Sequence, residues 1–253
     1  MKTYSLLIVD DEQTNCENLA DILEMFGHDV VWTCDPQAAL KLVEESPRGR
    51  FDIALIDLKM PEMNGAELLR RIRETNPFLQ AVLISAYIDT DEIDEGAKEL
   101  FEVILSKPVD VDALMESIKH IVPVVLCVDD DQDYCDVLTE IFSTSGIESF
   151  FGHSIESIQS KIDSNPYNVA VVDLRLPDGN GLAVVDLLKK SNPDIGVIVI
   201  SGYSNDIGEL ATQTTPSKIS AIFEKPVDSN ELLKKIFEIN HLKIRGRFEN
   251  PDS

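Results

Sequence analysis

Short apolar runs alternate along the chain with longer stretches in which apolar residues recur every three or four positions. In the first half, the apolar runs lie at about 4–9, 28–33, 51–57, 80–86 and 101–106. Runs of this length that are rich in β-branched residues predict strands. The stretches between them predict amphipathic helices at about 12–26, 35–45, 64–75, 89–99 and 110–121.

Strict alternation of strands and helices indicates a parallel sheet with helices on both faces. The fourth run reads Ala81-Val82-Leu83-Ile84 and is continuously apolar, as expected of a strand whose two faces are both covered. The right-handed rule for parallel crossovers then gives an α/β domain built from five strand–helix units.

The second half of the chain repeats the first with a period of about 116–119 residues, a domain-sized duplication. Asp10-Asp11 recurs as Asp129-Asp130, and Lys107-Pro108 recurs as Lys225-Pro226. The strands of the second half are predicted near 124–129, 147–152, 167–173, 195–201 and 219–224. Its fourth helix is predicted to be short, because the segment 212–216 reads Thr-Gln-Thr-Thr-Pro.

These patterns predict two domains, at 3–122 and 123–240, and a short tail at 241–253. Only two or so residues separate the last helix of the first domain from the first strand of the second. A connection this short is no flexible linker, so we expect a restricted orientation and an internal pseudo-dimer or a dimer.

Composition narrows the set of partners. The chain of 253 residues has 46 acidic and 22 basic residues, a net charge of −24. This charge argues against direct binding to nucleic acid or to an anionic membrane surface. No apolar run reaches the roughly 18–20 residues of a membrane span, and the first residues lack a signal-peptide pattern. Four cysteines without CxxC spacing suggest reduced thiols, and we expect a cytoplasmic protein.

The recurring polar residues fall where the predicted strands end, and ligands of parallel α/β sheets bind at that edge. Asp10 and Asp11 end the first strand, Asp57 the third and Ser85 the fourth, and Lys107 follows the fifth. Converging carboxylates repel each other, and Mg²⁺ relieves such repulsion by taking oxygen ligands. A carboxylate beside a metal, a hydroxyl and an ammonium group is suited to phosphoryl transfer, with the carboxylate as nucleophile.

Each half resembles a receiver domain of the two-component response regulators. The resemblance rests on the Asp-Asp pair, the Asp-x-x-x-Pro-x-x-x-Gly pattern, the Ser and the Lys-Pro, all present in both halves. It implies two flavodoxin-like domains, each a five-stranded parallel sheet of order 2-1-3-4-5. It also implies a phosphoryl group received from a phosphohistidine on a histidine kinase or a histidine phosphotransfer protein, and output through contacts with a downstream protein.

The resemblance also assigns roles to individual residues. The residues that match its phosphoryl chemistry are the phosphoacceptors Asp57 and Asp173, the hydroxyls of Ser85 and Ser201, and the lysines Lys107 and Lys225. The residues that match its Mg²⁺ (or Mn²⁺) site are Asp10, Asp11, Asp57, Asp129, Asp130 and Asp173, with the backbone carbonyls of Lys59 and Arg175. A cis peptide bond is expected before Pro108 and Pro226. Such a module modifies only itself and is not an enzyme for a separate substrate.

Two features depart from the family pattern or qualify it. The switch position three residues before the lysine usually holds Tyr or Phe, but Ile104 and Ile222 stand there. Long side chains flank each phosphoacceptor at Lys59 and Arg175, and Tyr87 and Tyr203 follow the switch serines. We therefore predict slow loss of the phosphoryl group by hydrolysis in both halves.

Three alternatives remain at this stage. The chain could be the receiver portion of a larger hybrid histidine kinase or cyclic-dinucleotide cyclase. It could be a scaffold that acts without phosphorylation. A haloacid-dehalogenase type of hydrolase is disfavoured, because that class needs Asp-x-Asp after its first strand and the nucleophile candidates here are followed by Leu-Lys and Leu-Arg.

Overall fold

The computed structural model describes residues 2–46, 50–86, 95–159, 161–162, 167–202 and 218–249. Within these ranges, none of the helices has the length and apolar character that a membrane span requires. The chain divides into two compact units, Met1–Val122 with Ile244–Ser253, and Pro123–Lys243.

The first unit alternates strands and helices as the sequence predicts. Its elements are β1 (Ser5–Val9), α1 (Gln13–Met25), β2 (Asp29–Thr33), α2 (Pro36–Glu45), β3 (Ile53–Asp57), α3 (Gly65–Thr75), β4 (Gln80–Ser85), α4 (Glu95–Lys98), β5 (Val103–Ser106) and α5 (Val111–Ile121). The strands form one parallel sheet of order β2-β1-β3-β4-β5, which confirms the predicted topology.

Local signals in the sequence set where these helices begin. The Asp35 side chain accepts a hydrogen bond from the Gln37 backbone N–H, and Pro36 occupies the first helical position of α2. The Asn64 side chain caps α3 in the same way, by accepting from the Glu67 N–H. The caps therefore place each helix start directly after the loop that leaves the preceding strand.

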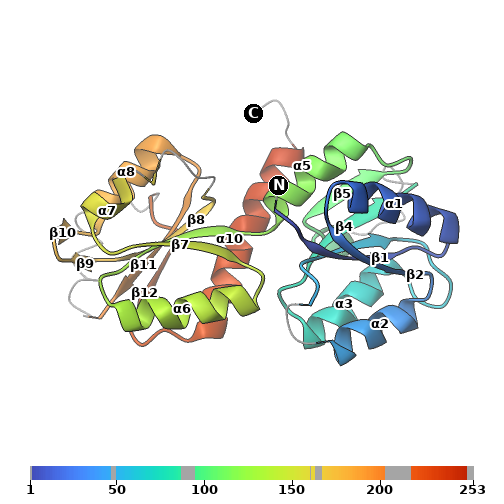
Figure 1. Ribbon diagram of the computed structural model, residues 1–253, viewed down its shortest axis with the longest axis horizontal. Helices are drawn as coiled ribbons and strands as arrows, with labels where there is room; N and C mark the ends of the chain where they lie inside the picture. Colours follow the sequence, from blue (N-terminus) through green and yellow to red (C-terminus); the bar gives the residue numbers. More distant parts are fainter. Residues whose placement is uncertain are drawn as a thin grey trace. The chain divides into compact units, whose positions relative to one another are not determined.

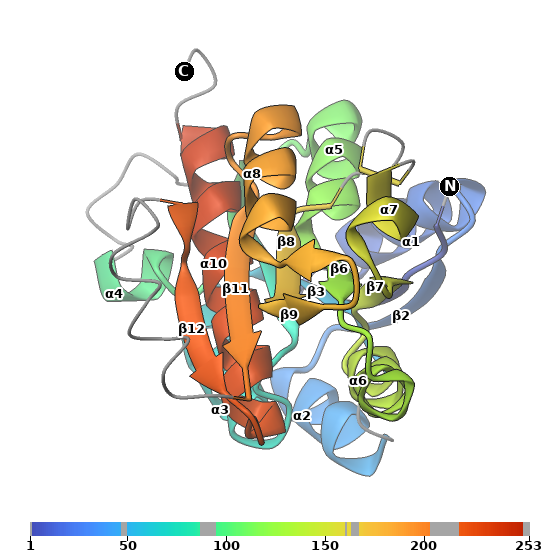
Figure 2. The same ribbon diagram turned by 90° about the vertical axis from the view of Figure 1, so that its left-hand side faces the viewer.

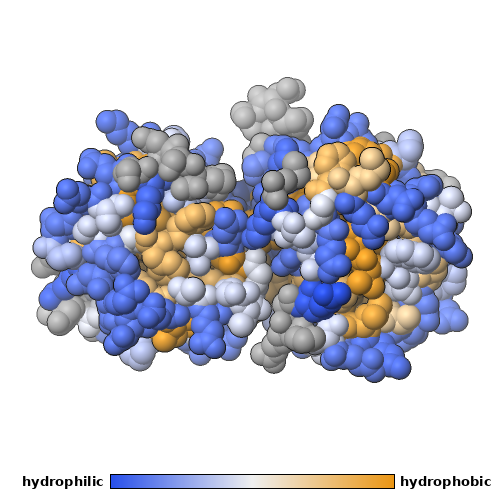
Figure 3. Space-filling view, in the orientation of Figure 1, coloured by the Kyte–Doolittle hydropathy of each residue, from blue (hydrophilic) through white to orange (hydrophobic). Residues whose placement is uncertain are grey.

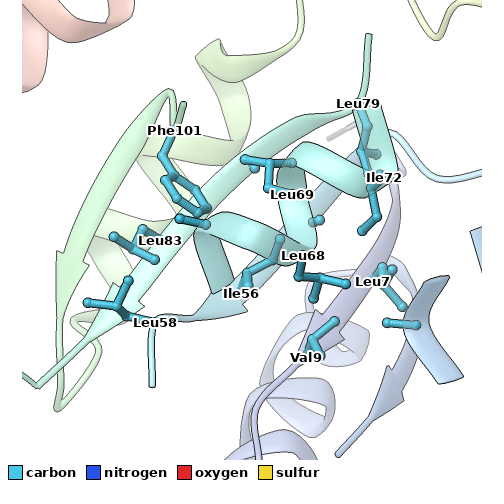
Figure 4. Packing of buried hydrophobic residues seen from close by; sticks show 14 of the residues in the cluster. Leu7, Val9, Ile56, Leu58, Leu68, Leu69, Ile72, Leu79, Leu83 and Phe101 are labelled. Carbon is cyan, nitrogen blue, oxygen red and sulfur yellow. The ribbon is translucent and has the colours of Figure 1, made fainter. Parts of the chain in front are cut away.

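The sheet is the middle layer of the unit. Helices α2 and α3 cover one face and α1 and α5 cover the other (Figure 1). Side chains of the first face, including Leu7, Ile56, Leu69 and Phe101, interlock in a fully buried core (Figure 4). A second core on the opposite face joins alternate residues of the same strands to α1 and α5. Burial on both faces explains the continuously apolar strands.

The second unit repeats this plan. Its elements are β6 (Val124–Val128), α6 (Gln132–Thr144), β7 (Glu148–Gly152), α7 (Ile155–Gln159), β8 (Val169–Asp173), β9 (Arg175–Leu176), β10 (Gly179–Asn180), α8 (Leu182–Ser191), β11 (Gly196–Ser201), β12 (Ala221–Glu224) and α10 (Ser229–Glu249). The five long strands pair in the order β7-β6-β8-β11-β12, the same topology as the first sheet. Figure 2 shows β12, β11 and β8 next to one another.

Three details differ from the sequence prediction or lie beyond it. The segment expected to be a separate tail from residue 241 is helical as far as Glu249, as the last part of α10. A short antiparallel hairpin, β9–β10, follows β8, the strand that ends at Asp173. The fourth helix predicted for the second half falls in 203–217, outside the described residues.

Candidate functional site

The polar residues singled out in the first unit meet at the carboxyl edge of its sheet. Asp10 directly follows β1 and Asp57 ends β3, and these two strands pair in parallel. Both carboxylates are about 5% exposed. Asp11 lies next to them and is exposed. The adjacent strand ends thus place two buried acids side by side, which requires a compensating positive charge.

Lys107 supplies that charge. Its Nζ lies 2.7 Å from Asp10 Oδ2 and 2.7 Å from Asp57 Oδ1. Burial lowers the pKa of Lys107, but its hydrogen bonds to Asp10 and Asp57 outweigh that effect and leave the pKa raised. The lysine is therefore held in its charged form. The Lys107–Pro108 peptide bond is cis, as predicted, and so is Lys225–Pro226.

Burial also acts on the phosphoacceptor candidate. It raises the pKa of Asp57, against the lowering effect of Lys107, and the charge of Asp10 adds to the rise. The second oxygen of the Asp57 carboxylate accepts a hydrogen bond of 2.8 Å from the Lys59 backbone N–H. The companion acid Asp10 is oriented by the Glu12 N–H at 3.0 Å and by the Asn15 side chain at 3.1 Å. Both carboxylates are thus fixed in direction.

The remaining residues proposed for this site lie around it. Ser85 ends β4 and is 2% exposed, and its carbonyl oxygen accepts a hydrogen bond of 2.9 Å from the Lys107 N–H. The side chain of Lys59 is exposed beside Asp57. Ile104, at the switch position, packs partly buried against the α2–α3 core. Tyr87 and Tyr203 lie outside the described residues, so the predicted hydrolysis rate remains a prediction.

The second unit has the same arrangement. Lys225 Nζ lies 2.7 Å from Asp129 Oδ2 and 2.5 Å from Asp173 Oδ2. The Arg175 N–H donates to Asp173 at 2.9 Å, as Lys59 does to Asp57. Ser201 ends β11 and is fully buried. Burial raises the pKa of Asp129 against the opposing hydrogen bond from Lys225.

Three carboxylates of the second unit could share a cation. Among the described residues, oxygens of Asp129, Asp130 and Asp173 lie within 4.8 Å of one another. An all-oxygen set with one exposed member fits Mg²⁺, which keeps several waters. The donor chemistry is therefore compatible with the predicted metal, and the equivalent residues of the first unit are Asp10, Asp11 and Asp57.

The sequence reasoning did not assign a role to two glycines that shape these sites. A Cβ added at Gly65 would lie 2.2 Å from the carbonyl oxygen of Asp57, and one at Gly181 would lie 2.0 Å from that of Asp173. The Gly65 N–H also donates to the Leu58 carbonyl at 2.9 Å. Each helix start therefore touches the backbone of the strand that ends at Asp57 or Asp173. The Asn-Gly repeat was the available signal, because only glycine permits that approach.

A second feature distinguishes the second unit from the first. The ring of Tyr134 lies against Lys225, with Nζ 4.7 Å from the ring centroid. Tyr134 occupies the position in the repeat that Asn15 occupies in the first unit. Aligning the two halves residue by residue would have exposed this difference.

Comparison with known proteins identifies the family of both halves. The family model of the response regulator receiver domain matches residues 6–119 and again 125–237. The chain belongs to the response regulator receiver family. The four cysteines of these tandem receiver domains are free thiols, as expected.

Three known proteins are similar to this chain, one over its whole length and two over less than half of it. The response regulator receiver protein Anae109_2439 of Anaeromyxobacter sp. (strain Fw109-5) is 32% identical over 254 residues and spans 100% of both chains. The photosynthetic apparatus regulatory protein RegA of Cereibacter sphaeroides is 37% identical over 109 residues, which cover 42% of this chain and 57% of that protein. A CheY-like receiver domain from Methanospirillum hungatei JF-1 has 28% identity and a TM-score of 0.43, covering 48% of this chain and 98% of its own.

Proposed function

We propose that both receiver domains accept a phosphoryl group from a phosphohistidine, on Asp57 in the first domain and on Asp173 in the second. The observation that carries this proposal is the lysine bridge, because the same ammonium-to-two-carboxylate geometry occurs in both domains. The bridge leaves a buried, oriented carboxylate beside a fixed positive charge, which is what an attacking aspartate needs.

The proposed reaction forms an O–P bond and breaks an N–P bond. An Asp57 carboxylate oxygen attacks phosphorus, and the bond to the donor imidazole breaks with the electron pair leaving on nitrogen, which takes up a proton. Lys107 neutralises charge on the phosphoryl oxygens as its contacts to Asp10 and Asp57 loosen. The Ser85 hydroxyl donates a hydrogen bond to one of those oxygens.

The same proposal covers the metal and the partners. Asp10 and Asp11 with the Lys59 carbonyl, and their counterparts Asp129, Asp130 and Arg175, would hold Mg²⁺ or Mn²⁺, which neutralises part of the phosphoryl charge. The donor would be a cytoplasmic histidine kinase or histidine phosphotransfer protein. Output would pass to a downstream protein, since the phosphoryl charge biases a switch near the buried serines.

The surface is consistent with recognition by proteins. The face in Figure 3 is mostly hydrophilic, with apolar patches between the polar residues. Large apolar side chains exposed on the described surface include Met25 and Phe26 at the end of α1, Val137 on α6 and Ile222 on β12.

Counting phosphoryl groups tests the proposal. Incubation of the whole chain with Mg²⁺ and acetyl phosphate should add two phosphoryl groups by intact mass, and EDTA should prevent both additions. Asp57→Asn and Asp173→Asn should each remove one addition. Asp29→Asn, a control at an exposed carboxylate paired with Arg50, should keep both. Absence of any adduct would leave a scaffold without phosphorylation as the better account, and adducts that survive in the double variant would refute Asp57 and Asp173 as the acceptors.

A further inference from the structure

A cleft opens in the first domain beside the lysine bridge. It lies between α1 and the segment that follows β5, and its volume is about 270 Å³. Its apolar wall includes Ile8, Leu19, Ile22 and Ile84, and Asn15 also lines it. Asp10, Asp57 and Lys107 form its polar end. We refer to this space as the domain-1 cleft.

In the second domain, a side chain of the protein reaches the corresponding position. Tyr134 replaces Asn15 in the repeat, and its ring lies against Lys225, the counterpart of Lys107. The Tyr134 hydroxyl is buried and makes no hydrogen bond with the described residues. The phenol therefore lies inside the domain and next to its lysine.

The groups that act electrostatically on the Tyr134 phenol are counterparts of residues that line the domain-1 cleft. Burial raises the pKa of Tyr134 to about 12, with Lys225 opposing the rise and Asp129, Cys127 and Asp173 adding to it. These four residues repeat Lys107, Asp10, Ile8 and Asp57, which all line the domain-1 cleft. The ring of Tyr134 thus takes up space that Asn15 leaves open in the first domain.

We propose that the domain-1 cleft is a binding site for a small aromatic molecule, whose ring would lie against Lys107 as the ring of Tyr134 lies against Lys225. The volume suffices, because an apolar protein cavity of about 150 Å³ accepts benzene. The apolar wall accounts for affinity, and the ammonium group of Lys107 favours an aromatic face over a saturated ring.

The hydroxyl of Tyr134 indicates what the site does not require. The Tyr134 hydroxyl has no hydrogen-bond partner among the described residues. We therefore expect the domain-1 cleft to recognise the aromatic ring of a ligand and not a substituent on that ring. A bound ring would also contact the edge of the cleft at Asp57, so occupancy would alter access to the phosphoacceptor.

Methyl NMR of the whole chain tests the site directly. Protein labelled at isoleucine δ1 methyls is titrated with phenol, and Ile8, Ile22 and Ile84 report on the domain-1 cleft. We expect their signals to shift saturably with a dissociation constant on the order of 1 mM, typical of a fragment with few atoms. Cyclohexanol should bind roughly 2- to 5-fold more weakly, since it lacks the interaction of an aromatic face with Lys107.

Reciprocal substitutions provide the matched controls. Asn15→Tyr should fill the domain-1 cleft and abolish the phenol-dependent shifts of Ile22 and Ile84. Tyr134→Asn should open the second domain, so that Ile141 and Ile200, the counterparts of Ile22 and Ile84, begin to shift. The spectra themselves show whether each variant is folded, and Leu19→Phe, one turn further along α1, narrows the cleft if Asn15→Tyr does not fold.

Two results would overturn the proposal. One is the absence of saturable shifts at Ile22 and Ile84 in the unmodified chain. The other is binding that persists unchanged in a folded Asn15→Tyr or Leu19→Phe variant. Because the readout is binding without a phosphodonor, either result is separate from success or failure of aspartyl phosphorylation.

Discussion

Substituting Gly65 by alanine should separate the first residue of α3 from β3, the strand that ends at Asp57. The added Cβ would lie 2.2 Å from the Asp57 carbonyl oxygen and 2.8 Å from Ile56 Cγ2. An ordinary contact requires about 1 Å more, so either the helix start or the end of β3 must move. The hydrogen bond from the Gly65 N–H to Leu58 would lengthen with that movement.

The cost follows from these distances. Overpacking of a tightly packed site costs about 1–3 kcal/mol. The higher helix propensity of alanine offsets roughly 0.5–1 kcal/mol of this cost. We therefore expect Gly65→Ala to lower the free energy of unfolding by about 1–2 kcal/mol. Moving the Asp57 carboxylate by about 1 Å relative to Lys107 should also slow its phosphorylation, by a factor on the order of 100.

Two assays separate these effects. Trp32 is the only tryptophan of the chain, and it packs partly buried against the α1–α5 core, so its fluorescence in urea reports unfolding of the first domain. Intact mass with time, in acetyl phosphate and Mg²⁺, gives the rate at Asp57 in an Asp173→Asn background. Gly202→Ala in the second domain is a control for the added methyl group, since its Cβ would meet nothing within 4 Å, and its urea unfolding is followed by circular dichroism.

The reasoning fails if Gly65→Ala keeps both the urea midpoint and the rate at Asp57. That result would mean that the loop before α3 absorbs the added methyl group without moving β3. A loss of stability with an unchanged rate would refute only the link between the glycine contact and the position of the carboxylate.

Three further changes test the packing and charge of each domain. Arg73→Ala should lower the free energy of unfolding, measured with urea, by about 3 kcal/mol, because it removes the ion pair at 2.8 Å from Glu102, whose side chain is only 4% exposed. Arg70→Ala, at an exposed arginine, is the control. Burial lowers the pKa of His28 from 6.5, so His28 is protonated at a higher pH in the unfolded chain than in the folded chain, and the free energy of unfolding falls below pH 6.5. His28→Phe should make that fall smaller in urea midpoints measured from pH 7 to 5. Burial lowers the pKa of Lys243 from 10.5 to about 8, so the free energy of unfolding should rise as the pH increases from about 8 to 10.5. Lys243→Met should remove this part of the rise in urea midpoints followed by circular dichroism. An unchanged pH profile would contradict the assignment.

The strand order and the meeting of polar residues at one sheet edge could be predicted from the chain because they rest on local and repeated signals. Continuous apolar runs such as Ala81–Ile84 require cover on both faces, and that requirement defines a parallel sheet. Asp10, Asp57 and Lys107 each follow a strand, and parallel strands bring their carboxyl ends together. The prediction needed no knowledge of individual contacts.

The length of α10 could not be predicted in this way. The segment from 241 carries Lys243, Arg245 and Arg247, and this density of charge suggested a polar tail. In the structure, Lys243 Nζ donates a hydrogen bond of 2.6 Å to the Asn168 carbonyl, and the Asn168 side chain donates to Asn240. Contacts between residues this far apart in the chain leave no periodic trace in the sequence.

The difference between the two halves is more informative than their agreement. Both halves keep the two buried acids, the lysine and the cis-proline, so the proposed reacting groups would offer a phosphodonor the same chemistry twice. The wall beside the lysine did change: Asn15 and Ile8 in one domain stand where Tyr134 and Cys127 stand in the other. In the second domain the ring of Tyr134 lies against one side of Lys225, whereas in the first domain Lys107 borders an open cleft. If the domains respond to different signals, the physical basis is access to the lysine, because the groups that would bind the phosphoryl oxygens do not distinguish them.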